Sequence, residues 1–148
     1  MARLLLFLGG MVFLALSACG PQADAKTVVE VFLSSREVGD IEGAMSVVAL
    51  DVVMRAPNEL QYKGLPQVRQ WLQASLNEYS YQTVSAPKMN GAVVTWQDNL
   101  LSQSGGRWVG EIEWQATVTD LKITTLTGKV IRGASGIICP QCPAGTRI

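Results

Sequence analysis

The C-terminal half of the chain alternates apolar and polar residues, and this period of two restricts the fold more than any other feature. The alternation fills four successive stretches, at residues 81–86, 92–102, 107–119 and 123–132. Only short turns separate these stretches, whereas a parallel pair of strands needs a crossover of a dozen or more residues. We therefore expect an antiparallel meander of long strands over this half of the chain.

The first half of the domain has helical periods instead. Apolar stripes with spacings of three and four residues predict helices over residues 26–39, 40–48 and 64–79. Two short strand-like segments, Val52–Arg55 and Gln61–Lys63, predict a hairpin between the second and third helices. Helices followed by long strands indicate an α+β fold with the helices against one face of the sheet.

Several short motifs occur along this pattern. They are Val28-Val29-Glu30-Val31-Phe32-Leu33, Gly39-Asp40-Ile41-Glu42-Gly43-Ala44, Leu50-Asp51-Val52-Val53, Gly64-Leu65-Pro66-Gln67-Val68-Arg69-Gln70-Trp71-Leu72 and Asp120-Leu121-Lys122-Ile123. In this order they resemble the nuclear transport factor 2-like superfamily, whose fold is also called SnoaL-like. The resemblance covers residues 26–132. It implies a cone-shaped, strongly curved antiparallel sheet packed against three N-terminal helices, with an apolar pocket inside the cone.

One position departs from the superfamily pattern. The turn before the last strand has Leu121 where the superfamily has Gly in an Asp-Gly-Lys-Ile sequence. A left-handed backbone at this position would strain Leu, because its Cβ atom approaches the following carbonyl oxygen.

The strand alternation assigns the Trp-bearing faces to the interior. Trp96 and Asp98 share such a face on one strand, and Trp114 lies on the next strand. Asp98 is a candidate general base, because desolvation among aromatic rings raises the pKa of a carboxyl group. The alternative is that Asp98 lies near the strand end and is solvated or paired with Arg107 or another base.

Other residues are candidates for binding a ligand. Arg55 and Tyr62 either supply a cation and a phenol at the pocket mouth for an anionic or polar ligand, or are exposed strand residues without function. Trp71, Trp96 and Trp114 are most simply core residues, some of which also line the pocket. Tyr81 is a further candidate for the pocket wall.

The resemblance also implies three enzymatic patterns. Dehydratase-like members use a His–Asp pair, which this chain cannot form because it contains no His. Epoxide hydrolase-like members use an Asp-Arg-Asp arrangement, and Gln97-Asp98-Asn99 lacks the Arg. Ketosteroid isomerase-like members use an Asp base with a Tyr/Asp oxyanion site, for which Asp98, Tyr62 and Tyr81 are the candidates.

We therefore expect a pocket for a small apolar or amphipathic ligand and assign no reaction. An isomerase or cyclase with Asp98 as general base, and a non-catalytic interaction scaffold, are the alternatives. No cofactor is expected. Twelve basic residues balance twelve acidic ones without a basic cluster, so nucleic acid is not an expected partner.

The superfamily also implies pairing of the outer sheet face in a homodimer. The residues concerned are Val93, Thr95, Val109 and Thr117, with Glu111 and Glu113 favouring a polar contact.

The first residues of the chain have the pattern of an export signal. Arg3 precedes an apolar run from Leu4 to Leu16, which is shorter than the ~20 residues of a membrane-spanning helix. The following Leu16-Ser17-Ala18-Cys19 resembles the lipobox of bacterial lipoproteins. The resemblance implies acyl chains on Cys19, cleavage just before it and a place on the extracytoplasmic side of the plasma or outer membrane. An ordinary signal peptide or an uncleaved anchor helix is the alternative.

The expected organisation is a signal peptide at 1–18, a lipid-anchored tether at 19–25, a single domain at 26–133 and a tail at 134–148. The tail contains Cys139-Pro140-Gln141-Cys142. Its flanking residues cannot form the helix of a thioredoxin-like site, and two thiolates without His make only half of a zinc site. In an exported chain we expect Cys139 and Cys142 to form a local disulfide.

Cys19→Ser is expected to abolish lipid attachment, because two or three acyl chains hold a domain on a membrane at ~0.8 kcal/mol per buried CH₂ group. Cells fed a clickable palmitate analogue should label the wild type but not this variant, and the variant should leave the detergent phase on partitioning. Cys139→Ser is the matched control and should keep the label. Unchanged mass and membrane association of Cys19→Ser would contradict the prediction.

Overall fold

The computed structural model describes residues 24–133. Cys19, the signal peptide and the tail with Cys139 and Cys142 therefore lie outside the described residues. Within the described part of the chain, no helix is both long and apolar enough to cross a membrane.

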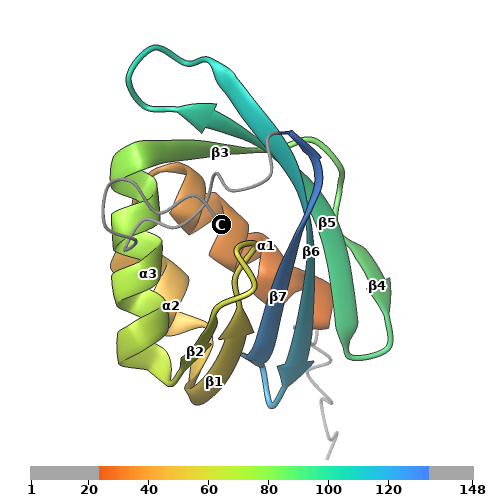
Figure 1. Cartoon of the computed structure of the whole chain (residues 1–148). Helices are drawn as coiled ribbons and strands as arrows, with labels where there is room; N and C mark the ends of the chain where they lie inside the picture. The colour runs from red at the N-terminus through yellow and green to blue at the C-terminus, as the bar shows by residue number, and fades with distance from the viewer. Residues whose placement is uncertain (1–23, 134–148) are drawn as a thin grey trace, which may run out of the picture.

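The described residues form three helices and seven strands, and all of these elements except β4 follow one another in the predicted order (Figure 1). They are α1 (Ala25–Glu37), α2 (Ile41–Ser46), β1 (Val48–Arg55), β2 (Gln61–Lys63), α3 (Leu65–Glu78), β3 (Tyr79–Thr83), β4 (Lys88–Asn90), β5 (Val93–Ser102), β6 (Trp108–Thr119) and β7 (Lys122–Gly133). The α+β class is confirmed. The short strand β4 occupies most of the predicted turn at residues 88–91, and β1 begins four residues earlier than expected.

The helix starts follow from local chemistry. The Asp24 carboxylate accepts a hydrogen bond from the Thr27 N–H at 2.8 Å, and the Asp40 carboxylate accepts one from the Gly43 N–H at 2.9 Å. These two caps satisfy N–H groups that a helix leaves free at its first turn. In α3 the first turn contains Pro66, whose missing N–H costs nothing there.

The strands form one mixed sheet in the order β2-β1-β7-β6-β5-β3, with β4 also paired to β5. The prediction of a wholly antiparallel sheet is wrong at one place, because β1 and β7 run parallel. Strand alternation shows which face of a strand is buried, but it does not show which strand will occupy its second edge. The last strand, β7, thus pairs with the first, β1, and joins the β1–β2 hairpin to the other strands of the sheet.

The three helices lie on the same side of the long strands (Figure 1). The buried sheet residues are those that the alternation assigned to the interior, including Trp96, Leu100, Ile112, Trp114 and Ala116. Trp108 is the exception, because it lies at the start of β6, beyond a register shift in the β5–β6 pairing, and is 44% exposed. They pack against the apolar stripes of α1 and α3, which contribute Val29, Phe32, Val68, Trp71 and Leu72. The core is therefore the layer between the helices and one face of the sheet.

The β6–β7 turn carries the strain that the sequence suggested. Thr119 pairs with Lys122, so Asp120 and Leu121 alone make the turn. Their φ angles are 50° and 58°, as a two-residue turn between twisted strands requires. Leu121 is 53% exposed, so packing of its side chain compensates little for the steric strain of its positive φ.

Leu121→Gly is expected to raise the free energy of unfolding by about 1 kcal/mol, because glycine adopts a positive φ without a steric penalty. Urea denaturation followed by tryptophan fluorescence measures the change. Leu50→Gly is the matched control, since Leu50 is 80% exposed on β1 and has no positive φ. The control should lose stability, and an equal loss in Leu121→Gly would contradict the prediction.

Candidate functional site

A small cavity lies in the core between α1, α3 and the sheet. Its volume is about 10 Å³, close to the minimum that holds one water molecule. The lining residues are Phe32, Arg36, Trp71, Leu72, Tyr81, Trp114 and Leu126. Three of them, Trp71, Tyr81 and Trp114, are predicted pocket residues. Side chains occupy the remaining interior, so a ligand of ordinary size requires some of them to move.

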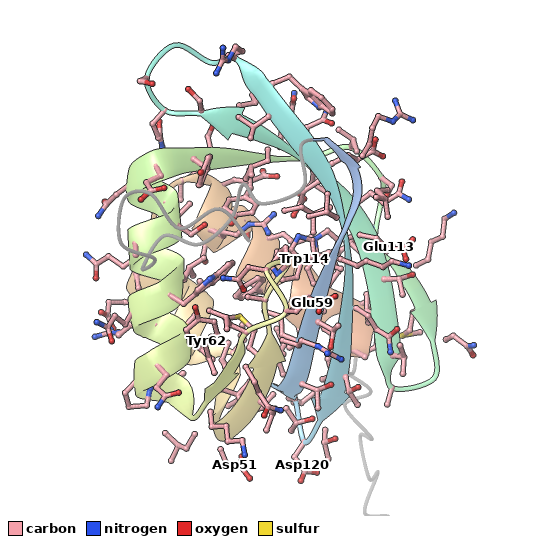
Figure 2. The ribbon with its side chains drawn as sticks, viewed as in Figure 1. Asp51, Glu59, Tyr62, Glu113, Trp114 and Asp120 are labelled. Atoms are coloured by element: carbon pink, nitrogen blue, oxygen red, sulfur yellow. The ribbon has the colours of Figure 1, made fainter. Side chains whose placement is uncertain are left out.

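Four of the seven side chains that line the cavity are aromatic, among them Trp114, which Figure 2 labels. The Trp114 ring lies edge-on to Trp71 at 6.0 Å and is stacked on Trp96 at 6.2 Å, both between ring centroids. Tyr81 is 6.5 Å from Trp114, and Tyr62 is 6.3 Å from Trp71. These distances are those of favourable aromatic pairs. The candidate aromatic residues therefore form one connected cluster.

Asp98 lies beside this cluster in a buried ion pair. Its Oδ2 atom is 2.8 Å from Nη1 of Arg36, and the two side chains are 0% and 2% exposed. The Thr83 hydroxyl donates to Oδ1 at 2.9 Å, and the Trp96 Nε1–H donates to Oδ2 at 3.2 Å. Asp98 is thus neither solvated nor paired with Arg107, but it is paired with another base, Arg36, as the alternative interpretation of this residue expected. Both of its oxygens are engaged by neighbours.

Arg36 is the residue of the site that the sequence reasoning missed. It follows Phe32 and Leu33 by four and three residues, so it continues the apolar stripe of α1 toward the sheet. Its guanidinium carbon lies 4.6 Å from the centroid of the Tyr81 ring and 5.9 Å from that of Phe32. A charged residue in line with a buried stripe was the signal that could have identified it.

Tyr81 joins the ion pair to α3. Its hydroxyl and the buried Ser75 hydroxyl share a hydrogen bond. Burial raises the pKa of Tyr81 to about 12, although the Ser75 hydrogen bond and the Arg36 charge act in the opposite direction. The phenol is therefore neutral at physiological pH and can serve as a hydrogen-bonding group in the core.

Three residues of the cavity wall carry buried N–H groups without an acceptor among the described protein atoms. They are Nε of Arg36 and Nε1 of Trp71 and Trp114. A buried donor without an acceptor costs about 1–3 kcal/mol, and native structures rarely leave several together. The cavity wall is thus suited to a group that accepts hydrogen bonds.

The remaining candidates do not meet at this cavity. Tyr62 is buried on β2 against Trp71, whereas Arg55 is exposed on β1 because it alternates with the buried Met54. Asp98 does not line the cavity, whereas its partner Arg36 does. Over residues 24–133 no group of three or more His, Cys, Asp or Glu side chains is placed to hold a metal ion.

Removing one partner of the Arg36–Asp98 pair is expected to lower the free energy of unfolding by about 3–5 kcal/mol, because the other charge stays buried alone. Asp98→Leu and Arg36→Met should each show this loss in urea denaturation. The double variant Arg36→Met with Asp98→Leu should lose less than either single variant, since no unpaired charge remains. Additive losses in the double variant would show that the two side chains do not act as a pair.

No protein-family model matches the sequence, and no curated protein matches it. Solved structures do match the fold. An NTF2-like protein of unknown function from Cytophaga hutchinsonii aligns with a TM-score of 0.63 at 12% identity, over 74% of this chain and 91% of that one. A candidate isomerase of the SnoaL-like family from Agrobacterium tumefaciens aligns with a TM-score of 0.59 at 16% identity, over 70% and 94%.

An LEH-like epoxide hydrolase from M. tuberculosis aligns with a TM-score of 0.60 at 19% identity, covering 72% of this chain and 81% of that one. At these identities the likeness concerns the fold alone. The chain has the fold of the NTF2-like, or SnoaL-like, proteins.

Proposed function

We propose that this chain is an extracytoplasmic lipoprotein domain that binds a small apolar or amphipathic molecule between its helices and its sheet. The observation that carries the proposal is the set of three acceptor-free donors, on Arg36, Trp71 and Trp114, around one aromatic-lined cavity. The proposal includes a cone-shaped sheet whose interior is this site. Structural neighbours named as a candidate isomerase and an epoxide hydrolase support a small-molecule site within the fold.

The ligand that suits this wall has an apolar body and at least one oxygen that accepts hydrogen bonds. Each hydrogen bond from a donor of the wall recovers part of the cost of leaving that donor unsatisfied. The apolar body gains contact with the rings of Trp71 and Trp114. Because the cavity measures only about 10 Å³, binding is coupled to separation of these rings, and the affinity is reduced by the cost of that step.

Asp98 is assigned a positioning role in this proposal. A general base needs a free oxygen near the substrate, but Arg36, Thr83 and Trp96 engage both oxygens of Asp98. Its carboxylate holds the Arg36 guanidinium over Tyr81, and Arg36 in turn lines the cavity. Catalysis by Asp98 in an isomerase or cyclase is therefore the less supported alternative, and we assign no reaction.

Lipidation of Cys19 would hold the domain near a membrane, which is a source of such ligands. The six residues from Cys19 to Asp24, which precede α1, span at most about 22 Å even when fully extended. The domain would therefore stay close to the bilayer, where apolar and amphipathic molecules are concentrated.

Trp71→Phe and Trp114→Phe are each expected to weaken ligand binding about fivefold, because each removes a donor worth about 1 kcal/mol and keeps most of the ring. Isothermal titration calorimetry of the mature, delipidated protein against medium-chain ketones, alcohols and acids measures the affinity. Trp108→Phe is the matched control, since Trp108 also lies on β6 but is 44% exposed. It should bind as the wild type does.

A protein that binds no member of this panel would contradict the proposal and favour the interaction scaffold. Equal affinities in all three variants would show that the tryptophan donors do not contact the ligand.

A further inference from the structure

A depression on the protein surface lies over the aromatic cluster. Its volume is about 340 Å³, within the ordinary range for a small-ligand site. The residues that line it belong to the end of β1, the β1–β2 turn and β7, and they are Arg55, Ala56, Pro57, Glu59, Thr127, Gly128, Lys129 and Val130. Figure 2 shows Glu59 on this turn in the region of Trp114.

Only a thin wall separates this depression from the inner cavity. A Cβ atom on Gly128 would lie 2.7 Å from Cζ3 of Trp114 and 2.9 Å from Cγ of Pro57. The β7 backbone at Gly128 therefore touches both the floor of the depression and the ring that lines the cavity. Displacement of the Trp114 ring and of Pro57 would join the two spaces into one.

The β1–β2 turn, residues 56–60, forms one side of this wall, and its hydrogen bonds, from the N–H groups of Ala56, Glu59 and Leu60, are accepted within the turn itself. Pairing of β1 with β7 ends at Arg55 and Thr127, so the turn extends past the ladder. Glu59 has a φ of 65°, and Nδ2 of Asn58 is buried without an acceptor among the described atoms. Both features cost free energy in the closed arrangement. Movement of this turn would relieve them.

The rim of the depression is cationic. Arg55 and Lys129 form no ion pair within the described part of the chain. Glu59 is the acidic residue of the lining, and Glu113 lies opposite Lys129 in the β6–β7 register. Neither carboxylate lies within 4.0 Å of the two cations. The guanidinium and the ammonium are thus available to an anion, and a guanidinium binds a carboxylate through two parallel hydrogen bonds.

We propose that this depression is the entrance to the ligand cavity, and that Arg55 and Lys129 hold there the carboxylate of a single-chain amphiphile whose apolar chain passes Gly128 toward Trp114. This inference rests on the proposed function and names the class of its ligand as a fatty-acid-like carboxylate. The apolar lining from Ala56, Pro57 and Val130 accommodates the first part of the chain.

Calorimetric titration of the mature, delipidated protein with dodecanoate and with dodecan-1-ol tests the headgroup. The double variant Arg55→Glu with Lys129→Glu should bind dodecanoate at least tenfold more weakly and dodecanol within twofold of the wild type. Lys88→Glu with Arg107→Glu changes the net charge equally at two exposed residues outside the depression, and it should change neither affinity. Added salt should weaken the binding of dodecanoate alone.

The route of the chain is tested with 12-bromododecanoate, whose bromine quenches tryptophan at contact. Quenching should fall strongly in Trp114→Phe and persist in Trp108→Phe. Equal binding of the acid and the alcohol, unaffected by charge reversal, would overturn the carboxylate site and leave the proposed function standing. Binding of neither compound would overturn both. Charge-sensitive binding to phosphatidylglycerol vesicles without binding of dodecanoate would assign the two cations to a membrane surface instead and overturn the entrance.

Discussion

The arrangement of the interior depends on the buried ion pair between Arg36 and Asp98. Each charge loses its hydration in the core, and the attraction between them compensates only when further hydrogen bonds complete the pair. Thr83 and Trp96 provide those bonds to Asp98, and the Tyr81 ring lies under the Arg36 guanidinium. The pair therefore fixes α1 against β5. It also sets the position of the aromatic rings that line the cavity.

The positions of these aromatic rings limit the space inside the fold. Trp71 and Trp114 lie in contact across the region where we propose that a ligand binds, and the cavity between them is about 10 Å³. Their N–H groups and Nε of Arg36 remain without acceptors, so the closed interior is not fully satisfied. A ligand with an apolar body and an oxygen atom would accept these hydrogen bonds. It would also replace the contact between the two rings with contacts between the rings and the ligand.

The periods of the sequence were sufficient to predict every element except β4, because apolar spacing reflects which side of a helix or strand is buried. They also placed Trp96, Asp98 and Trp114 correctly on inward faces, whereas Trp108, on the same face, is exposed. They could not predict the parallel pairing of β1 with β7, which depends on contacts between distant segments. The partner of Asp98 was missed because Arg36 looked like an ordinary charged residue near a helix end. The volume of the cavity depends on how the side chains pack, and the spacing of apolar residues in the sequence does not predict this.

Native mass spectrometry of the protein, purified from its own host in mild detergent and then delipidated, tests the central claim most directly. The account predicts a population with one additional non-covalent mass in the range of a single-chain amphiphile. Collisional activation should release it, and Trp71→Phe with Trp114→Phe should deplete it. A protein that is repeatedly free of any small molecule, and that stays free after incubation with host lipid extract, would contradict the account.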